Sequence, residues 1–319
     1  MILLLGATGY IGSAFSEELT RRGRDFRPIS RIEADYTRFG PLLELLRQTK
    51  PEFVVNCAGF TGRPNVDACE SAKADTLLGN ALLPQTIAHA CLTVGIPWGH
   101  VSSGCIYAGA KVRGSDGVWR TETDLMRSDV LEMILADRQS LRGFTEEDAP
   151  NFSFRCPPCS FYSGTKALGE EALLGIGESY IWRLRIPFDG QDNARNYLSK
   201  IQRYSKVYNN INSVSHRGDF ASACLDCWEK RVPWGLYNVT NPGWVTTCDV
   251  VELIRKHVAP HRRFEYWDND GEFYQVAAKT PRSNCVLDSA KLLATGVRIR
   301  PVNEALELSL RNWVAEASR

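Results

Sequence analysis

The stretch Met1-Ile-Leu-Leu-Leu-Gly-Ala-Thr-Gly-Tyr-Ile-Gly12 decides the fold of this 319-residue chain. An apolar run breaks into glycines at positions 6, 9 and 12, and apolar residues then recur at helical spacing up to Gly23. This order predicts a buried strand, a glycine turn and a helix. Such a turn binds dinucleotides because glycine lets a pyrophosphate approach the backbone N–H groups at the helix N-terminus. The spacing G-x-x-G-x-x-G departs from the standard G-x-G-x-x-G, so we expect a variant turn.

A catalytic pair is predicted in Tyr162-Ser-Gly-Thr-Lys166. Four-residue spacing on a helix places a phenol and an ammonium on one face, one turn apart. A nearby cation favours the phenolate, so the tyrosine becomes able to exchange a proton near neutral pH. Upstream, Val101-Ser-Ser-Gly-Cys-Ile-Tyr107 reads as a strand that ends in small polar residues. In an open parallel sheet, this is where catalytic groups lie beside the cofactor.

With these motifs the chain resembles the extended short-chain dehydrogenase/reductases over nearly its whole length. Asn56-Cys-Ala-Gly59 and Arg183-Leu-Arg-Ile-Pro187 add to the likeness. Within that family it is most similar to the nucleotide-rhamnose synthase/epimerase-reductase and dTDP-4-dehydrorhamnose reductase branch. The segments that carry this narrower likeness are Gly59–Asp67, Gly104–Tyr107, Gly143–Phe152, Asn193–Lys200 and Pro281–Asn284.

The resemblance implies an NADPH-dependent 3,5-epimerase/4-reductase of a nucleotide-linked 4-keto-6-deoxyhexose. Tyr162 would protonate the C4 oxyanion, Lys166 would lower the tyrosine pKa and hold the nicotinamide ribose, and Ser103 would hydrogen-bond the carbonyl. Cys105 and Lys200 match the family's candidates for the acid/base pair that epimerises C3 and C5. Packing at a strand end for Cys105, and a surface or phosphate-binding role for Lys200, are the alternatives.

The end of the second strand, Pro28-Ile-Ser-Arg31, bears on the choice of cofactor. NAD-binding folds usually place an acid there for the ribose 2′-hydroxyl, whereas an arginine accommodates a 2′-phosphate. No acid follows until Glu33, which favours NADPH, with NADH and a solvated Arg31 as the alternatives. The residues assigned to the cofactor are Gly6, Thr8, Gly9, Tyr10, Ile11, Gly12, Ser30, Arg31, Ala58, Gly59, Asn80, Tyr162, Lys166 and Pro187.

Other polar residues in the matched segments are assigned to the nucleotide sugar. Arg63, Asn65 and Asp67 follow the third strand and are expected near the sugar. Guanidinium groups bind phosphate bidentately, so the nucleotide phosphates are assigned to Arg195, Asn196 and Arg282. Loop arginines are also commonly solvated, and His100 reads as structural.

The alternation of strand and helix patterns predicts an α/β fold, a Rossmann-like doubly wound parallel sheet with a smaller C-terminal substrate-binding lobe. We expect a cofactor domain over 1–187 and a substrate lobe over 188–319, interleaved with the first. Helices are expected near 68–78 and 80–94. An insertion at about 108–143 distinguishes the chain from its relatives, and Thr123–Leu141 within it looks like an amphipathic helix. A lid, an oligomer contact and a surface decoration remain open for it.

Composition limits the other classes. The net charge of +1, with acids and bases interspersed, gives no footprint for nucleic acid or membrane. The first apolar run is too short for a signal peptide or membrane span, so we expect a cytoplasmic protein. A homodimer is one assembly that we consider for it. Ten cysteines include the pairs Cys156/Cys159 and Cys224/Cys227. The long separation of the pairs favours free thiols over a zinc site, and no metal is expected.

Three functional readings remain. The first is the bifunctional enzyme, and the second is a single-function reductase, epimerase or dehydratase on a similar sugar. Gly104-Cys105 after Ser103 argues against a 4,6-dehydratase, in which an Asp-Glu pair is expected. The third is a non-catalytic, reductase-like regulatory subunit. Such proteins tend to lose the tyrosine, lysine or serine that this chain retains.

Overall fold

The computed structural model describes residues 1–315, and the chain divides into two compact units. Unit 1 comprises residues 1–106, 150–183 and 221–237, and unit 2 comprises residues 107–149, 184–220 and 238–319. The chain therefore passes between the units several times. The sequence-based division at residue 187 differs from this one, because the insertion belongs to unit 2 and a later segment returns to unit 1.

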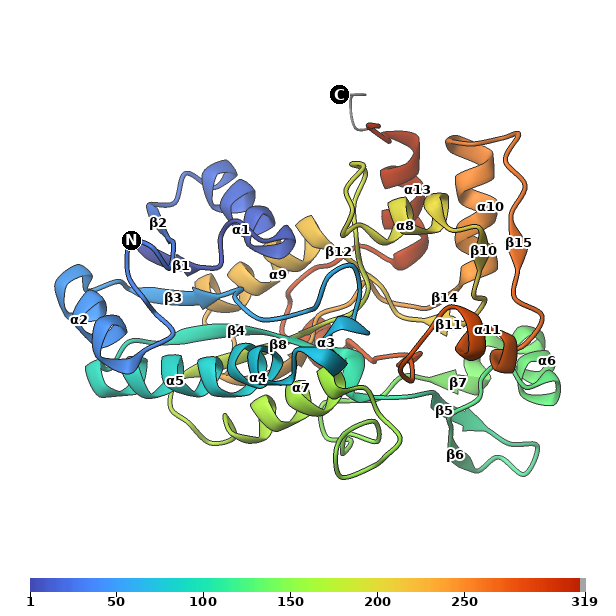
Figure 1. Cartoon of the computed structure of the whole chain (residues 1–319), viewed down its shortest axis with the longest axis horizontal. Coiled ribbons are helices and arrows are strands. Elements are labelled where there is room, and N and C mark those ends of the chain that lie inside the picture. The colour runs from blue at the N-terminus through green and yellow to red at the C-terminus, as the bar shows by residue number, and fades with distance from the viewer. Residues whose placement is uncertain (316–319) are drawn as a thin grey trace. The chain divides into compact units, whose positions relative to one another are not determined.

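Unit 1 is built on a six-stranded sheet with the order β13-β8-β4-β3-β1-β2 (Figure 1). Its elements, three of which extend by a few residues into unit 2, are β1 (Ile2–Leu5), α1 (Tyr10–Arg21), β2 (Phe26–Ile29), α2 (Phe39–Thr49), β3 (Phe53–Asn56), α3 (Ala68–Ser71), α4 (Lys73–Leu77), the π-helical turn η1 (Leu78–Leu82), α5 (Leu83–Val94), β4 (Trp98–Ser103), the 3₁₀ turn η2 (Gly104–Ile106), α7 (Phe161–Glu171), β8 (Ser179–Leu184), α9 (Arg217–Glu229) and β13 (Gly235–Asn238). The pairs β1–β2, β1–β3 and β3–β4 are parallel. The predicted α/β class is confirmed.

The strand order reverses between β1 and β3, since β2 lies on the far side of β1. At such a switch point, the loops after neighbouring strands diverge and leave a crevice at the carboxyl ends of the strands. The glycine turn follows β1 and the segment Cys57–Gly59 follows β3. The topology thus brings two of the predicted cofactor segments to one edge.

Helices cover both faces of this sheet, and successive strand residues point alternately toward one layer of helices and the other. Leu3, Leu5 and Val54 share one buried cluster with Leu46 of α2 and Ile87 of α5. Aromatic rings fill the other side: Phe53 stacks on Trp228 of α9 with ring centroids 4.4 Å apart, and Trp182 lies beside Phe15 of α1. Because both faces are buried, the central strands β1 and β3 are almost continuous apolar runs, as central parallel strands commonly are.

The helices expected near 68–78 and 80–94 are arranged differently. A short α3 is followed by one helical run, Lys73–Val94, in which η1 forms a π turn between α4 and α5. This run is the one helix among the described residues long and apolar enough, by length and composition alone, to cross a membrane. Its Ile87, Ala90 and Cys91 are buried in the core of unit 1, and core helices commonly pass that test.

Unit 2 contains short strands and helices around two apolar clusters. Its elements are β5 (Ala110–Arg113), β6 (Trp119–Glu122), α6 (Ser128–Ala136), η3 (Arg138–Ser140), β7 (Leu141–Arg142), β9 (Pro187–Phe188), α8 (Tyr197–Arg203), β10 (Lys206–Val207), β11 (Ile211–Asn212), β12 (Ser215–His216), β14 (Val245–Thr246), α10 (Thr247–His257), β15 (Glu265–Tyr266), α11 (Asp270–Val276), α12 (Ala290–Ala294) and α13 (Val302–Arg311). One cluster packs α8, α10 and α13 together through Ile201, Ile254 and Leu306.

The insertion forms the second cluster of unit 2, and its predicted helix is shorter than expected. Only Ser128–Ala136 is α-helical, and the strands β5 and β6 before it and β7 after it form a three-stranded sheet of order β6-β5-β7. Asp116-Gly117 makes the hairpin turn: the Asp116 carboxylate accepts the Val118 N–H and Gly117 has φ +78°. Ile134 is buried with Val112, Ile211 and Trp244, so the insertion is packed into unit 2.

Candidate active site

The glycine turn after β1 is built by close packing. Gly6 has φ +76°, and a Cβ there would lie 2.6 Å from the Ala58 backbone nitrogen. A Cβ on Gly12 would lie 2.1 Å from the Gly6 carbonyl oxygen, so glycine is what allows α1 to pack on the turn. Gly9 is the exposed N-cap of α1 and the first turn of the helix carries no acid. With exposed Thr8, this end of the helix suits an anion.

The end of β2 presents the residues assigned to the 2′-position of the cofactor. Ser30 and Arg31 are both exposed, and the Ser30 hydroxyl accepts the Glu33 N–H at 3.2 Å. The carboxylate of Glu33 accepts a hydrogen bond from Arg27 at 2.5 Å. The nearest acid is therefore engaged with another arginine. This arrangement fits a 2′-phosphate better than a 2′-hydroxyl.

Gly59, Asn80 and Lys166 converge beyond the end of β3. A Cβ on Gly59 would lie 3.2 Å from the Asn80 Oδ1 and 3.7 Å from the Lys166 Nζ. The fully buried Asn80 amide fixes the segment that follows β3. It accepts the Phe60 N–H at 2.9 Å and donates to the Phe60 carbonyl at 2.8 Å. The Ala58 N–H donates to Asn56 at 2.9 Å. Gly59 and Asn80, two residues predicted to bind the cofactor, thus lie together beside Lys166.

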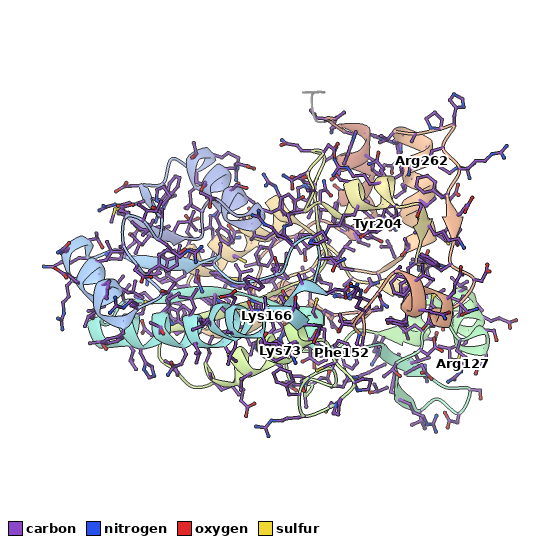
Figure 2. The ribbon with its side chains drawn as sticks, in the orientation of Figure 1. Lys73, Arg127, Phe152, Lys166, Tyr204 and Arg262 are labelled. Atoms are coloured by element: carbon purple, nitrogen blue, oxygen red, sulfur yellow. The ribbon has the colours of Figure 1, made fainter. Side chains whose placement is uncertain are left out.

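Helix α7 carries Tyr162 and Lys166 on its buried face. Lys166 is labelled in Figure 2. The helix begins at the N-cap Ser160, whose hydroxyl accepts the Ser163 N–H at 3.1 Å. Tyr162 is 8% exposed and Lys166 is 5% exposed. The Lys166 ammonium donates to the Val101 carbonyl of β4 at 3.4 Å. Burial lowers the pKa of Lys166 to about 8, against the opposing effects of Glu170 and Cys105.

The end of β4 supplies Ser103 and Cys105, and α7 packs against both β4 and η2. The Ser103 hydroxyl accepts the Cys105 N–H at 3.2 Å, so it caps the turn that displays the thiol. The hydroxyl of the neighbouring Ser102 donates instead to Glu170. Tyr162, Lys166, Ser103 and Cys105 therefore belong to one helix–strand contact within unit 1.

His100, on the same strand, is structural as expected. Its ring is hydrogen-bonded to Asn56 at 3.0 Å and is 1% exposed. Burial and the nearby Lys166 hold the pKa of His100 well below its usual range. Cys224 and Cys227 are buried free thiols of α9. Among residues 1–315, no group of three or more His, Cys, Asp or Glu is arranged to hold a metal.

The loop after β3 holds the first group assigned to the sugar. Arg63 is exposed, whereas Asn65 and Asp67 are half-buried. The Asn65 side chain accepts the Asp67 N–H at 2.8 Å, which shapes the loop. A role for these residues in sugar binding stays a prediction.

The other assigned residues lie in unit 2. Lys200 is on α8, where burial and the charge of Arg195 lower its pKa. Asn196 is fully buried and caps α8: it accepts the Leu198 N–H at 2.9 Å and donates to Asp189 at 2.8 Å. Its amide is therefore committed to the fold of the segment, and a phosphate contact from it stays a prediction. Half-buried Arg282 follows α11, and half-buried Pro187 begins β9.

Sequence reasoning missed Glu170 and Arg183 as parts of this site. Glu170 follows Lys166 by the same four residues that separate Lys166 from Tyr162, and that spacing was the available signal. Arg183 was noticed only as part of a matched segment. The two form a buried ion pair of 2.7 Å.

A glycine turn at the switch point of a parallel sheet, beside a Tyr–x–x–x–Lys helix and a serine at the next strand end, defines a short-chain dehydrogenase/reductase. The chain belongs to the RmlD substrate binding domain family, whose model matches residues 1–314.

Characterised relatives agree with this placement. The bifunctional dTDP-4-dehydrorhamnose 3,5-epimerase/dTDP-4-dehydrorhamnose reductase of Arabidopsis thaliana is 31% identical over 307 residues, which cover 95% of this chain and 90% of the relative. A trifunctional UDP-glucose 4,6-dehydratase/UDP-4-keto-6-deoxy-D-glucose 3,5-epimerase/UDP-4-keto-L-rhamnose-reductase of the same plant is 30% identical over 95% of this chain. The chain spans about 40% of the length of that relative.

Solved structures share the fold. The UDP-rhamnose synthase of Acanthamoeba polyphaga mimivirus superposes with a TM-score of 0.80 at 23% identity, over 98% of each chain. The dTDP-4-dehydrorhamnose reductase of Bacillus anthracis, solved in complex with NADP, gives a TM-score of 0.73 at 18% identity, over 98% of this chain and 97% of that one.

Proposed function

We propose that this chain is an NADPH-dependent 3,5-epimerase/4-reductase of a nucleotide-linked 4-keto-6-deoxyhexose in rhamnose-type biosynthesis. The observation that carries the proposal is the buried Tyr162–Lys166 face of α7 against the Ser103–Cys105 end of β4. The name of the bifunctional relative, of which this chain covers 90%, gives the same two activities, a 3,5-epimerase and a reductase. A cytoplasmic location and a nucleotide-sugar substrate are parts of this proposal.

The residues present fit NADPH. The close-packed Gly6 and Gly12 leave the N-terminus of α1 open for a pyrophosphate, and exposed Arg31 suits a 2′-phosphate. Gly59 leaves the Lys166 ammonium accessible where a Cβ would otherwise approach it. When bound, the cofactor supplies the hydride for C4 of the sugar.

In the reductive step, the hydroxyl of Tyr162 donates its proton to the C4 oxygen as the carbonyl carbon is reduced, which gives the neutral alcohol. The Lys166 ammonium favours the phenolate that remains, and so lowers the pKa of the tyrosine toward neutrality. The Ser103 hydroxyl hydrogen-bonds the same oxygen and stabilises its developing negative charge. Solvent then returns the proton to Tyr162.

Epimerisation uses Cys105 and Lys200 as the acid/base groups. The protons on C3 and C5 are acidic because the C4 ketone stabilises the resulting enolate, and each is removed from one face and returned to the other. The Cys105 thiol lies close enough to the Lys166 ammonium to interact with it electrostatically. Burial and the charge of Arg195 lower the pKa of Lys200, so that its neutral amine form becomes easier to reach. The guanidinium groups of Arg195 and Arg282 are assigned to the nucleotide phosphates.

The test is incubation of the purified protein with UDP-4-keto-6-deoxyglucose, then its dTDP analogue, and NADPH in D2O. We expect NADPH oxidation with deuterium at C3 and C5 of a rhamnose product. Tyr162→Phe should slow NADPH oxidation by about 10²–10⁴-fold, and Cys105→Ser should abolish the label. Oxidation without label would reduce the activity to 4-reduction alone. Absence of oxidation with either sugar, in protein that binds NADPH, would refute the substrate assignment.

A further inference from the structure

A buried carboxylate, Glu170, lies one helical turn beyond Lys166 on α7. It is 5% exposed and accepts hydrogen bonds from two side chains. Ser102 of β4 donates its hydroxyl proton at 2.5 Å. Arg183 of β8 donates from Nη2 at 2.7 Å and from Nε at 3.0 and 3.1 Å. The guanidinium of Arg183 and the hydroxyl of Ser102 thus supply the partners that a buried carboxylate requires.

The same helix face holds β4 at two consecutive residues. The Lys166 ammonium donates to the Val101 carbonyl, and the Glu170 carboxylate accepts from Ser102. Ser103 is the next residue of the strand. Tyr162, Lys166 and Glu170 follow one another at four-residue intervals and so share this face. The register of the strand end against the helix is therefore set by the pair Lys166 and Glu170.

Among the charged and titratable groups around Lys166, Glu170 is the carboxylate that favours the charged form of the lysine. On α7 these groups are Tyr162 and Glu170, on η2 the group is Cys105, and on β4 it is His100. Because the pKa of His100 is held well below its usual range, that ring stays neutral. Arg183 lies on β8 and is bound to Glu170. The carboxylate opposes the burial that lowers the pKa of the lysine.

We propose that Glu170 is a positioning residue: its carboxylate, fixed by Arg183 and Ser102, keeps the Lys166 side chain charged and aimed at the end of β4. The consequence for catalysis rests on the proposed function, in which the Lys166 ammonium is required. A purely structural ion pair would stabilise α7 against β8 and leave the titration of Lys166 unchanged.

The first experiment follows the titration of Lys166 without substrate or cofactor. The protein is labelled with [13Cε]lysine, and the Lys166 resonance is assigned from its absence in Lys166→Met. Glu170→Gln keeps the shape and removes the charge, so the titration midpoint should fall by about one pH unit or more. Glu170→Asp keeps the charge and should stay near the wild-type midpoint. Ser102→Ala removes one hydrogen bond but no charge, and should leave the midpoint unchanged.

Glu170→Gln leaves Arg183 buried without its partner, which can prevent folding. Glu170→Gln/Arg183→Gln removes both charges and avoids that penalty, and its Lys166 midpoint should also fall. An unchanged midpoint in the folded charge-removing variants would overturn the inference.

The second experiment measures the pH profile of NADPH-dependent turnover. In Glu170→Gln the alkaline limb should move to lower pH by the shift seen in the lysine titration. A uniform loss at all pH values, with an unmoved lysine midpoint, would mean a structural ion pair only and would overturn the inference. A shifted midpoint with an unmoved limb would support the role of Glu170 toward Lys166, and would count against the role of Lys166 in the proposed reaction.

Discussion

Replacement of Gly12 by alanine tests the packing of the glycine turn. A Cβ at this position would lie 2.1 Å from the Gly6 carbonyl oxygen and 2.8 Å from the Ala7 Cα. Ordinary van der Waals contact begins at 3.4 Å, and 3.4 − 2.1 = 1.3 Å, so α1 and the turn must separate by that amount. Both obstructing atoms belong to the backbone, which cannot rotate away as a side chain does.

The cost follows from two opposing terms. Overpacking of this kind destabilises a protein by about 1–3 kcal/mol. Alanine in a helix gains about 1 kcal/mol over glycine. We therefore expect Gly12→Ala to lower the free energy of unfolding by about 1 kcal/mol. The effect on NADPH should be larger, because each charge-assisted hydrogen bond lost at the displaced turn costs about 1.5–3 kcal/mol, which is at least about tenfold in the dissociation constant.

Urea unfolding of the apoprotein and NADPH titration by fluorescence measure the two effects. Gly9→Ala is the matched control: its Cβ would lie 3.3 Å from the same carbonyl oxygen, a contact that small adjustments relieve. It should unfold at nearly the wild-type urea concentration. If Gly12→Ala unfolds later than wild type and binds NADPH with wild-type affinity, the packing argument is refuted.

Three further predictions concern the same unit. Tyr162→Phe should lower kcat by about 10²–10⁴-fold with little change in NADPH affinity, measured by steady-state kinetics and fluorescence titration, because only the proton donor is lost; a kcat near wild type would contradict its role. Turnover should be highest below pH 8 and fall as pH rises, because the pKa of Lys166 is about 8 and its charged form is required; a pH–rate profile flat to pH 10 would contradict this. Arg31→Ala should raise the NADPH dissociation constant about tenfold or more and change that of NADH little; equal losses for both cofactors would remove Arg31 from the 2′-phosphate site.

The sequence predicted the first strand, the glycine turn and the helix that carries Tyr162 and Lys166 well, because their signals are local. A Cβ on Gly6 would collide with Ala58, and one on Gly12 would collide with Gly6, so both positions need glycine. The glycine spacing of such a turn can be recognised in the sequence alone. The Tyr162–Lys166 pair is likewise defined by helical spacing. The alternation of strands and helices predicted the parallel sheet, although its edge strand β13 was not predicted.

The features that were missed depend on contacts between distant segments. The apolar residues of 123–141 satisfy a helical pattern, yet Leu141 lies on a strand that pairs with Val112. The π turn at Leu78–Leu82 accompanies the close approach of Gly169 to the Asn80 carbonyl, where a Cβ would lie only 2.2 Å away. The spacing after Lys166 hints at Glu170, but the contacts that hold its carboxylate come from Ser102 of β4 and Arg183 of β8.

The alternation of the chain between its two units has a consequence for its synthesis. The sheet of unit 1 ends at β13, which pairs with β8 and is supplied by Gly235–Asn238, far beyond the catalytic helix. While the ribosome is still short of that strand, β8 presents an unpaired edge, and such edges are prone to intermolecular pairing. No single cut of the gene separates the two units, because each consists of three segments. The nascent protein must therefore keep β8 protected until Gly235–Asn238 has been synthesised.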